Sequence, residues 1–142
     1  MEIKNKKAYF NYFVESSIES GIALVGSEIK SIKKGSVNLT DSYIRIKNNE
    51  AFIINMFIDK YEEANIFNHE PTRERKLLLH KKEIKKLYDE VKNGGYTLIP
   101  LSIYIKNGKC KILVGLCKGK KLYDKRESIK KRDLERENKK WR

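Results

Sequence analysis

Alternating apolar and polar residues recur along this 142-residue chain and predict a protein made mainly of β-strands. Strands are expected over residues 8–16, 22–25, 42–47, 51–58, 96–106 and 109–116. Two dipeptides, Asn48-Asn49 and Asn107-Gly108, predict hairpin turns, because Asn and Gly tolerate the positive φ angles that tight hairpins need. A further turn is expected at Ser20-Gly21, between the first two strands.

Two helices are expected among these strands. The first covers residues 28–34, with Ser27 as its N-cap and Gly35 as its stop. The second starts near residue 80 and ends at an Asn-Gly-Gly stop, and its apolar residues recur at i, i+3, i+4 and i+7. Residues 59–75 predict a long loop, which in a small domain is usually functional or mobile. The pattern as a whole favours a small closed sheet, for which an OB-type barrel is one option among several.

The C-terminal residues 118–142 differ in character from the rest. They carry 12 of the 32 Lys and Arg residues but only five of the 19 Asp and Glu residues, and few apolar ones. Such a segment cannot bury enough apolar surface to offset its chain entropy, so we expect a folded domain over residues 1–117 and a basic tail that is disordered in the free protein. Basic arms of this kind usually become ordered on a polyanion, most often nucleic acid. The body contributes +6 of the formal net charge of +13, which suggests a second contact surface.

The cysteines and the hydropathy indicate a cytoplasmic protein. Cys110 and Cys117 lie seven residues apart in one predicted strand and would point to opposite faces, so we expect two reduced thiols in or near the core. No apolar run reaches transmembrane length. We therefore expect a soluble protein that has no membrane partner.

The sequence contains no recognisable catalytic or metal-binding motif. His69 and His80 have no metal-ligand spacing with each other or with the cysteines, and no phosphate-binding glycine motif is present. Glu15, Glu19 and Glu28 are candidates for acid–base chemistry, but solvated or capping roles are far more common for such residues. We expect no metal, no cofactor and no enzymatic activity.

The segment RERKLLLHKKE, residues 73–83, joins a basic cluster to an apolar triplet and a histidine. In one interpretation Arg73, Arg75 and Lys76 bind phosphates while Leu78 and His80 pack against unpaired bases, as single-stranded or loop RNA allows. In the other, the segment is a loop that leads into a buried strand or a helix end and carries solvated arginines. Spacing alone favours the second interpretation by about two to one, because charge clusters near helices are common.

Five strings of the sequence are together very specific. They are NKKAYFNYF, IESGIALVGSEIKSIKKGSVNLTDSYI, NHEPTRERKLLLHKKEI, GYTLIPLSIY and GLCKGKKLYDKR. In this order, from about Asn5 to Arg126, the chain resembles small protein B, the SsrA-binding protein family of bacteria. The resemblance implies an OB-fold-like antiparallel β-barrel with flanking helices and a disordered basic C-terminal tail.

The resemblance also implies a function in trans-translation. Members of this family bind the tRNA-like domain of transfer-messenger RNA (SsrA) and deliver it, aminoacylated with alanine, to ribosomes stalled without a stop codon. The implied partners are transfer-messenger RNA, the decoding centre and mRNA channel of the ribosome, and elongation factor Tu in the delivery complex. The protein is expected to be a monomeric RNA-binding adaptor and not an enzyme.

The resemblance assigns RNA contacts to individual residues, first of all to Glu19, Leu78, His80 and Lys111. Glu19 is informative because a carboxylate repels phosphates but accepts hydrogen bonds from base amino groups, so it suits a base edge. Basic or polar neighbours in the matching strings and at the base of the tail are expected to contribute. These are Asn5, Lys6, Lys7, Arg73, Arg75, Lys76, Lys118, Lys120 and Lys121.

For the tail, the resemblance gives Tyr123 a stacking role in the decoding centre and makes Asp124, Lys125 and Arg126 necessary for accommodation after binding. We expect the tail to become helical on the ribosome, because from Lys130 onward it contains good helix formers and neither Gly nor Pro. An isolated helix this short and polar is only marginal in water.

Other functions fit the composition and stay open as alternatives. A generic single-stranded-RNA-binding or ribosome-associated OB protein would tolerate many RNAs, whereas the family demands a folded tRNA-like partner. A small nuclease is disfavoured by the missing acid–base constellation. A membrane-surface protein with a polybasic tail is disfavoured because no lipidation motif or apolar helix face lies beside the tail.

Overall fold

A computed structural model describes residues 2–62 and 68–120 of the chain. Lys121 and the predicted tail residues 123–126 lie outside this part. The elements are β1 (Glu2–Lys4), α1 (Lys6–Asn11), β2 (Tyr12–Ile22), α2 (Gly26–Lys33), β3 (Val37–Asn38), β4 (Tyr43–Lys47), β5 (Glu50–Ile54), β6 (Phe57–Ile58), β7 (Arg75–Leu78), α3 (Lys81–Gly94), β8 (Thr97–Lys106) and β9 (Lys109–Gly119).

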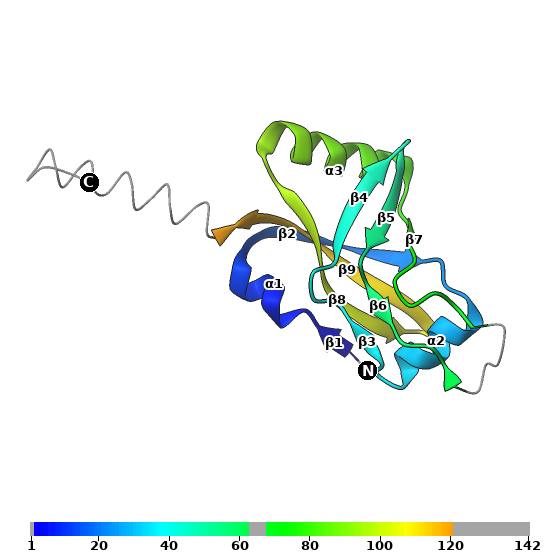
Figure 1. The fold of residues 1–142 in the computed structure, drawn as a ribbon. Helices are drawn as coiled ribbons and strands as arrows, with labels where there is room; N and C mark the ends of the chain where they lie inside the picture. The colour runs from blue at the N-terminus through cyan, green and yellow to red at the C-terminus, as the bar shows by residue number, and fades with distance from the viewer. Residues whose placement is uncertain (1, 63–67, 121–142) are drawn as a thin grey trace, which may run out of the picture.

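Seven of these strands form one antiparallel sheet in the order β1-β8-β9-β2-β7-β5-β4, and β3 pairs with β6. Because β4 also packs beside β8, the sheet curls back on itself. Helices α1 and α2 lie at opposite ends of the long strands β2 and β9, and α3 lies at the top of the view (Figure 1). This mainly-β barrel with flanking helices confirms the predicted fold class.

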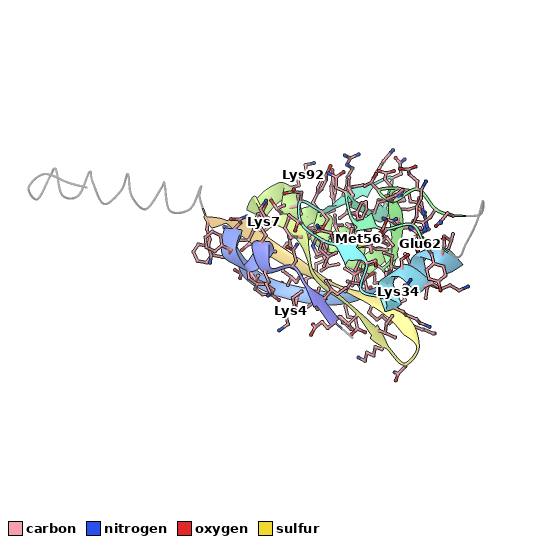
Figure 2. All side chains as sticks on the ribbon, turned by 60° about the horizontal axis from the view of Figure 1, so that its bottom comes forward. Lys4, Lys7, Lys34, Met56, Glu62 and Lys92 are labelled. Atoms are coloured by element: carbon pink, nitrogen blue, oxygen red, sulfur yellow. The ribbon has the colours of Figure 1, made fainter. Side chains whose placement is uncertain are left out.

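Two apolar clusters lie on the two faces of the curled sheet. The larger fills the barrel and includes the fully buried Met56, which lies within the ribbon in Figure 2, while Lys4, Lys7, Lys34 and Lys92 lie around it. The smaller joins Ala8 of α1 to residues of β8 and β9 on the outer face. α1 therefore covers one part of the outer face, and the part of β8 and β9 nearer their shared hairpin stays open.

The two cysteines belong to different clusters, as the strand alternation predicts. Cys110 packs against the barrel core and Cys117 lies in the smaller outer cluster, and both are free thiols. Burial raises the pKa of each thiol to about 11, so both stay protonated at neutral pH.

The N-terminal strand expected over residues 8–16 is partly wrong. Residues 6–11 form α1, because Asn5 caps the helix by accepting a hydrogen bond from the Ala8 amide at 3.2 Å and Ala8 is buried. The turn expected at Ser20-Gly21 is also wrong. Both residues lie inside β2, where Gly21 pairs with β9 on one side and β7 on the other, and the chain leaves the sheet only after Ile22.

Two further boundaries differ from the expected ones. The strand predicted over residues 51–58 is broken at Asn55, whose φ of 62° ends β5 before β6 begins. Ser27 is not the N-cap of α2, because the helix begins at Gly26 and the carboxylate of Glu28 accepts from the Val25 amide at 2.9 Å instead. The second helix is confirmed as α3.

Both predicted asparagine-containing hairpin turns are confirmed. The central residues Asn48 and Asn49 have φ of 52° and 62°, and Asn107 and Gly108 have φ of 52° and 76°. The second turn brings β8 and β9 into register, with Lys106 opposite Lys109. It thereby fixes which side chains of these strands share the outer face.

Candidate nucleic-acid interface

Strand register gathers widely separated residues on the open part of the outer sheet face. Leu78 on β7 lies opposite Gly21 on β2, Gly21 lies opposite Lys111 on β9, and Lys111 lies opposite Tyr104 on β8. Directly opposed residues of antiparallel strands point to the same face. We call this surface the ladder face and define it by Glu19, Gly21, Leu78, Tyr104, Lys106 and Lys111.

An apolar side chain lies exposed at one side of the ladder face. Leu78 is 58% exposed, although its neighbour Leu77 is buried in the core, because successive strand residues point to opposite faces. Leu78 lies against Gly21, where an added Cβ would come within 3.3 Å of Leu78 Cδ1. A groove of about 350 Å³ runs from Leu78 past Leu24 and Ile29 to the hairpin at Lys109. An apolar groove rimmed by lysines suits an unpaired base with its phosphate.

A carboxylate is held in place at the other side of the face. The hydroxyl of Tyr104 donates to Glu19 Oε2 at 2.6 Å, and Lys106 Nζ donates to the same oxygen at 3.4 Å. The hydrogen bond from Tyr104, with smaller contributions from Lys106 and Lys111, holds the pKa of Glu19 below its usual value. Burial and the bond to Glu19 raise the pKa of Tyr104 to about 12. Glu19 is therefore an ionised and exposed acceptor, and Tyr104 and Lys106 both donate to the same one of its two oxygens, Oε2.

Two more of the predicted contact residues lie within two positions of Leu78, Lys76 on β7 and His80 at the start of α3. His80 is exposed and follows Leu78 by two residues, and its backbone amide donates to the Glu83 carboxylate at 2.9 Å at the start of α3. Lys76 precedes Leu78 by two residues, and its ammonium lies 2.5 Å from Glu50 Oε2 with about half of the side chain exposed. Both side chains are accessible to a ligand on this side of the barrel.

Arg75, predicted to bind phosphate, lies in the interior instead, and this corrects its assignment. Its side chain has no exposed surface and forms an ion pair with the equally buried Glu28. Its guanidinium also donates to the carbonyl oxygens of Met56 at 2.7 Å and Pro71 at 3.0 Å. Arg75 therefore organises the loop before β7 and does not reach a ligand. Neither interpretation of residues 73–83 fits this residue, because Arg75 begins β7 and is buried, so it is neither a phosphate ligand nor a solvated loop arginine.

Arg73 completes the same buried ion-pair network from its edge. It makes a bidentate contact to Glu28, with Nε at 2.9 Å from Oε2 and one terminal nitrogen at 2.6 Å from Oε1. Burial alone would raise the pKa of Glu28, but hydrogen bonds from Arg73, the Val25 amide and Arg75 outweigh it and lower the pKa. About a third of the Arg73 side chain stays exposed, so this residue can still approach a phosphate.

The predicted contact residues near the N-terminus likewise include one buried residue and two exposed ones. Asn5 is only 5% exposed, and its amide nitrogen donates to the carbonyl oxygens of Pro100 at 2.9 Å and Leu39 at 3.3 Å. Its buried position corrects the prediction of a direct RNA contact. Lys6 and Lys7 are exposed on α1, and Lys7 Nζ lies 3.2 Å from Asp41 Oδ1.

Two of the predicted contact residues at the base of the tail, Lys118 and Lys120, lie far from the ladder face. Lys118 and Lys120 come at the end of β9, which continues two residues beyond the expected domain end at 117. Lys118 lies seven positions after Lys111 along β9, which corresponds to about 23 Å at the usual strand rise.

Sequence reasoning missed three residues of the ladder face, Gly21, Tyr104 and Lys106, and also Lys109 in the neighbouring groove. The signal was present in the alternation of SIYIK, where Tyr104 and Lys106 share the polar side of a strand. What the sequence did not contain was the register that sets Tyr104 beside Glu19, 85 positions earlier in the chain.

Within the described residues, the structure contains no group of three or more His, Cys, Asp or Glu side chains placed to hold a metal ion. His69 is buried and structural, with Nδ1 2.8 Å from Ser27 Oγ and Nε2 2.8 Å from the carbonyl oxygen of Ile58. None of the described helices is long and apolar enough to cross a membrane.

The barrel and the ladder face define a nucleic-acid-binding β-barrel protein. The chain matches the family described as "SmpB protein" over residues 2–142 and belongs to that family. It is 56% identical to the SsrA-binding protein of Shouchella clausii over 94% of this chain and 86% of the relative. It is 59% identical to that of Caldicellulosiruptor bescii, over 94% and 84% of the two chains.

A solved structure supports the same assignment. One chain of the structure described as "tmRNA-SmpB: a journey to the center of the bacterial ribosome" matches with a TM-score of 0.71 and 41% sequence identity. The match covers 84% of each chain. The resemblance drawn from the five sequence strings is thereby confirmed at the level of the family.

Proposed function

We propose that this protein binds the tRNA-like domain of transfer-messenger RNA through the ladder face and carries it to stalled ribosomes in trans-translation. The observation that carries the proposal is the cross-strand row in which the exposed Leu78, Lys111 and the Tyr104-bound Glu19 share one face. The names of the relatives, which describe SsrA-binding proteins, support the identity of the RNA.

The chemistry of the face suits looped RNA whose bases are unpaired. Leu78 and the neighbouring groove supply an apolar surface for a base, and the ionised Glu19 accepts from base amino groups. Lys106, Lys109 and Lys111 neutralise adjacent phosphates. His80, Lys76, Arg73, Lys6 and Lys7 are accessible and extend this contact, whereas Asn5 and Arg75 act by holding the fold. The protein in this proposal is an adaptor without catalytic activity.

Affinity measurements on full-length protein test the proposal. Competition of labelled tRNA-like domain with unlabelled tRNA and poly-U should show a strong preference for the tRNA-like domain. Leu78→Ala should remove much of this affinity, whereas Phe57→Ala, an exposed apolar control on β6, should not. Equal competition by poly-U would instead support a generic single-stranded-RNA-binding protein.

The tail is assigned the ribosomal half of the function. In the proposal, Lys118, Lys120 and Lys121 lead the chain toward the decoding centre, where Tyr123 stacks on a base and residues 124–126 support accommodation. The tail then becomes helical in the mRNA path, because the phosphates there compensate its cations. Tyr123→Ala should impair peptide tagging far more than transfer-messenger RNA binding, and Tyr123→Phe should preserve both. A Tyr123→Ala protein that supports normal tagging would refute the stacking role.

The remaining partners follow from this role. We propose that the protein acts as a monomer in the cytoplasm and joins elongation factor Tu in the delivery complex. Size-exclusion chromatography with aminoacylated transfer-messenger RNA and GTP-bound elongation factor Tu should yield one complex with a single copy of this chain. A complex with two copies would contradict the monomeric assignment.

A further inference from the structure

One edge of the long strand β2 has no partner strand over most of its length. Among the described strands, β7 pairs with β2 only at Gly21 and Ile22, so Tyr12–Ser20 lie beside β9 on one side and beside no strand on the other. Such an edge presents unpaired N–H and C=O groups, which a further extended segment can bind by adding a strand to the sheet. The free edge of β2 is therefore a candidate docking site for a peptide.

An apolar groove lies directly beside this free edge. It has a volume of about 520 Å³ and lies between β2 and α3. Its apolar lining comes from these two elements and from β9, and consists of Ile18, Leu87, Val114 and Leu116. Sites that bind a peptide by strand addition combine these two features, because the edge supplies main-chain hydrogen bonds and the groove receives alternate side chains of the peptide.

Carboxylates border the groove, although the chain as a whole is strongly basic. Glu15 comes from β2 and Glu83 and Glu90 come from α3, while Lys86 is the one cation among the described lining residues. Within the part of the chain that the structure describes, Glu15 and Glu90 form no ion pair. Burial, and after it the charges of Glu15 and Glu90, raise the pKa of Tyr96, which also lines the groove. A negative groove favours a basic occupant.

The C-terminal tail of the same chain has the composition of such an occupant. Residues 121–142 contain ten Lys and Arg and five Asp and Glu, together with apolar side chains that include Tyr123 and Ile129. The chain enters the tail next to the groove, because the ammonium of Lys118 lies 4.7 Å from the ring centroid of Tyr96. From β9 across β2 to the free edge is two strand spacings, about 10 Å, which about four extended residues span.

The order of side chains in the tail also matches the groove. Tyr123 and Ile129 are an even number of positions apart, so in an extended segment both point to one side and can enter the apolar groove. Lys125 and Arg126 lie between them in the sequence and can meet the carboxylates at the border. A nucleic acid fits less well, because its phosphates would face the unpaired Glu15 and Glu90.

We propose that in the free protein residues 122–129 dock in this groove as an added strand along the free edge of β2, with Lys125 and Arg126 beside Glu15 and Glu90. Docking replaces the fully disordered tail that composition alone predicts. It also withholds the tail from other polyanions until a ribosome competes for it. The inference does not rest on the proposed function, because the groove and the free edge belong to the body and share no residue with the ladder face.

The test uses the full-length protein with a nitroxide on an engineered cysteine, Ser128→Cys. The native thiols have pKa values of about 11 and stay protonated at neutral pH, so the new thiol reacts selectively. Paramagnetic broadening of backbone amide signals then reports where the tail lies. We expect Ser16, Ser17 and Leu87, which line the groove, to be broadened far more than Tyr9. Tyr9 lies on α1 at the end of the barrel where the tail begins, so equal broadening of Tyr9 and the groove would mean a free tail and would overturn the inference.

Charge reversal in the groove should release the tail. In Glu15→Lys, Glu90→Lys the ratio of docked to free tail should fall about threefold or more, as for the loss of two surface ion pairs. Glu83 stays in place because its carboxylate accepts from the His80 amide at the start of α3. The charge-matched control is Glu2→Lys, Asp59→Lys, which alters two exposed carboxylates outside the groove and should leave the broadening unchanged. Equal loss in both double variants would reduce the effect to net charge and contradict docking at this site.

The reverse exchange in the tail checks the pairing itself. Lys125→Glu, Arg126→Glu should release the tail of the unmodified body and should restore docking when combined with Glu15→Lys, Glu90→Lys. Failure of the combined variant to restore the broadening, with a normally folded body, would refute this pairing.

A mixed sample separates the tail of the same chain from that of a second copy. Isotope-labelled protein without nitroxide is mixed with nitroxide-labelled protein of natural isotope content, so any broadening must come from another molecule. Docking within one chain predicts none. Broadening of Ser16 and Leu87 in the mixture would identify the tail of a second copy as the occupant and would overturn the inference.

Discussion

Two glutamates of this protein, Glu28 and Glu19, both accept hydrogen bonds from neighbouring side chains but have opposite roles. Glu28 is fully buried and holds Arg75 and Arg73, whereas Glu19 sits on the sheet surface with Tyr104 and Lys106. Both have a lowered pKa because hydrogen bonds favour the ionised form. The difference is burial: inside the protein, every donor around the carboxylate is committed to the fold. On the surface, one side of the carboxylate remains available to a ligand.

The largest expected effect is the loss of the buried carboxylate. Glu28→Ala should lower the free energy of unfolding by about 3–5 kcal/mol, because it leaves the buried Arg75 without its partner. Urea denaturation measures this change. The matched control is Glu50→Ala, which removes the exposed 2.5 Å pair with Lys76 and should cost about 0–1 kcal/mol. Equal losses for the two variants would erase the distinction between buried and exposed pairs.

Removing the outer arginine of the network should weaken it partially. Arg73→Met should cost about 1–2 kcal/mol, at the low end for hydrogen bonds to charged groups because this side chain is partly exposed. It should also change acid stability. The folded-state pKa of Glu28 is lowered, so its contribution is present above the unfolded pKa and lost as pH falls through the folded pKa.

Because Arg73 lowers this pKa, Arg73→Met should raise it, and acid unfolding should begin at a higher pH than in the unmodified protein. Circular dichroism between pH 6 and pH 2 follows this shift. An acid transition at the same or a lower pH would show that Arg73 does not stabilise the ionised carboxylate.

Leu78→Ala should separate binding from folding. More than half of this side chain is exposed, so truncation should leave the free energy of unfolding within about 0.5 kcal/mol. Affinity for the tRNA-like domain should fall about tenfold, as for the loss of one base-packing side chain. Fluorescence anisotropy gives the affinity and urea denaturation the stability. Parallel losses in both would place Leu78 in the fold and not in the interface.

The smallest expected effect is on Glu19. Glu19→Gln should reduce RNA affinity several-fold, because an amide is a weaker acceptor than a carboxylate, and should not change the unfolding transition. Tyr104→Phe should have a similar but weaker effect, since it releases the carboxylate from its 2.6 Å bond without removing it. Tighter binding by Glu19→Gln would show that the carboxylate repels phosphate and does not accept from a base.

The sequence predicts much of the barrel but less of the site. The hairpin turns at Asn48-Asn49 and Asn107-Gly108 and the helix α3 follow from local chemistry, and the structure has them where expected. The strand expected from residue 8 is wrong over residues 8–11, because aromatic residues favour strands, whereas the cap from Asn5 and the burial of Ala8 produce a helix. These contacts outweigh the preference of the aromatic residues for a strand.

The two arginines show most clearly what the sequence alone cannot predict. Arg73 and Arg75 look alike in the string RERK, and only the return of β7 beside β5 and the approach of α2 place Glu28 beside them. In the same way, Tyr104 and Glu19 meet only through the shared partner strand β9. Residue types therefore predict a basic surface, but strand register decides which charges remain available to bind.

The most direct test of the account is the affinity and salt dependence of the Glu19→Gln, Leu78→Ala double variant for the tRNA-like domain. If the ladder face recognises bases, affinity should fall more than about tenfold. The slope of log affinity against log salt should stay unchanged, because neither substitution removes a phosphate contact. Each lost phosphate contact would lower this slope by roughly 0.7–0.9. The unfolding transition should match that of the unmodified protein. Affinity within twofold of that protein, with a normally folded variant, would contradict recognition by this face.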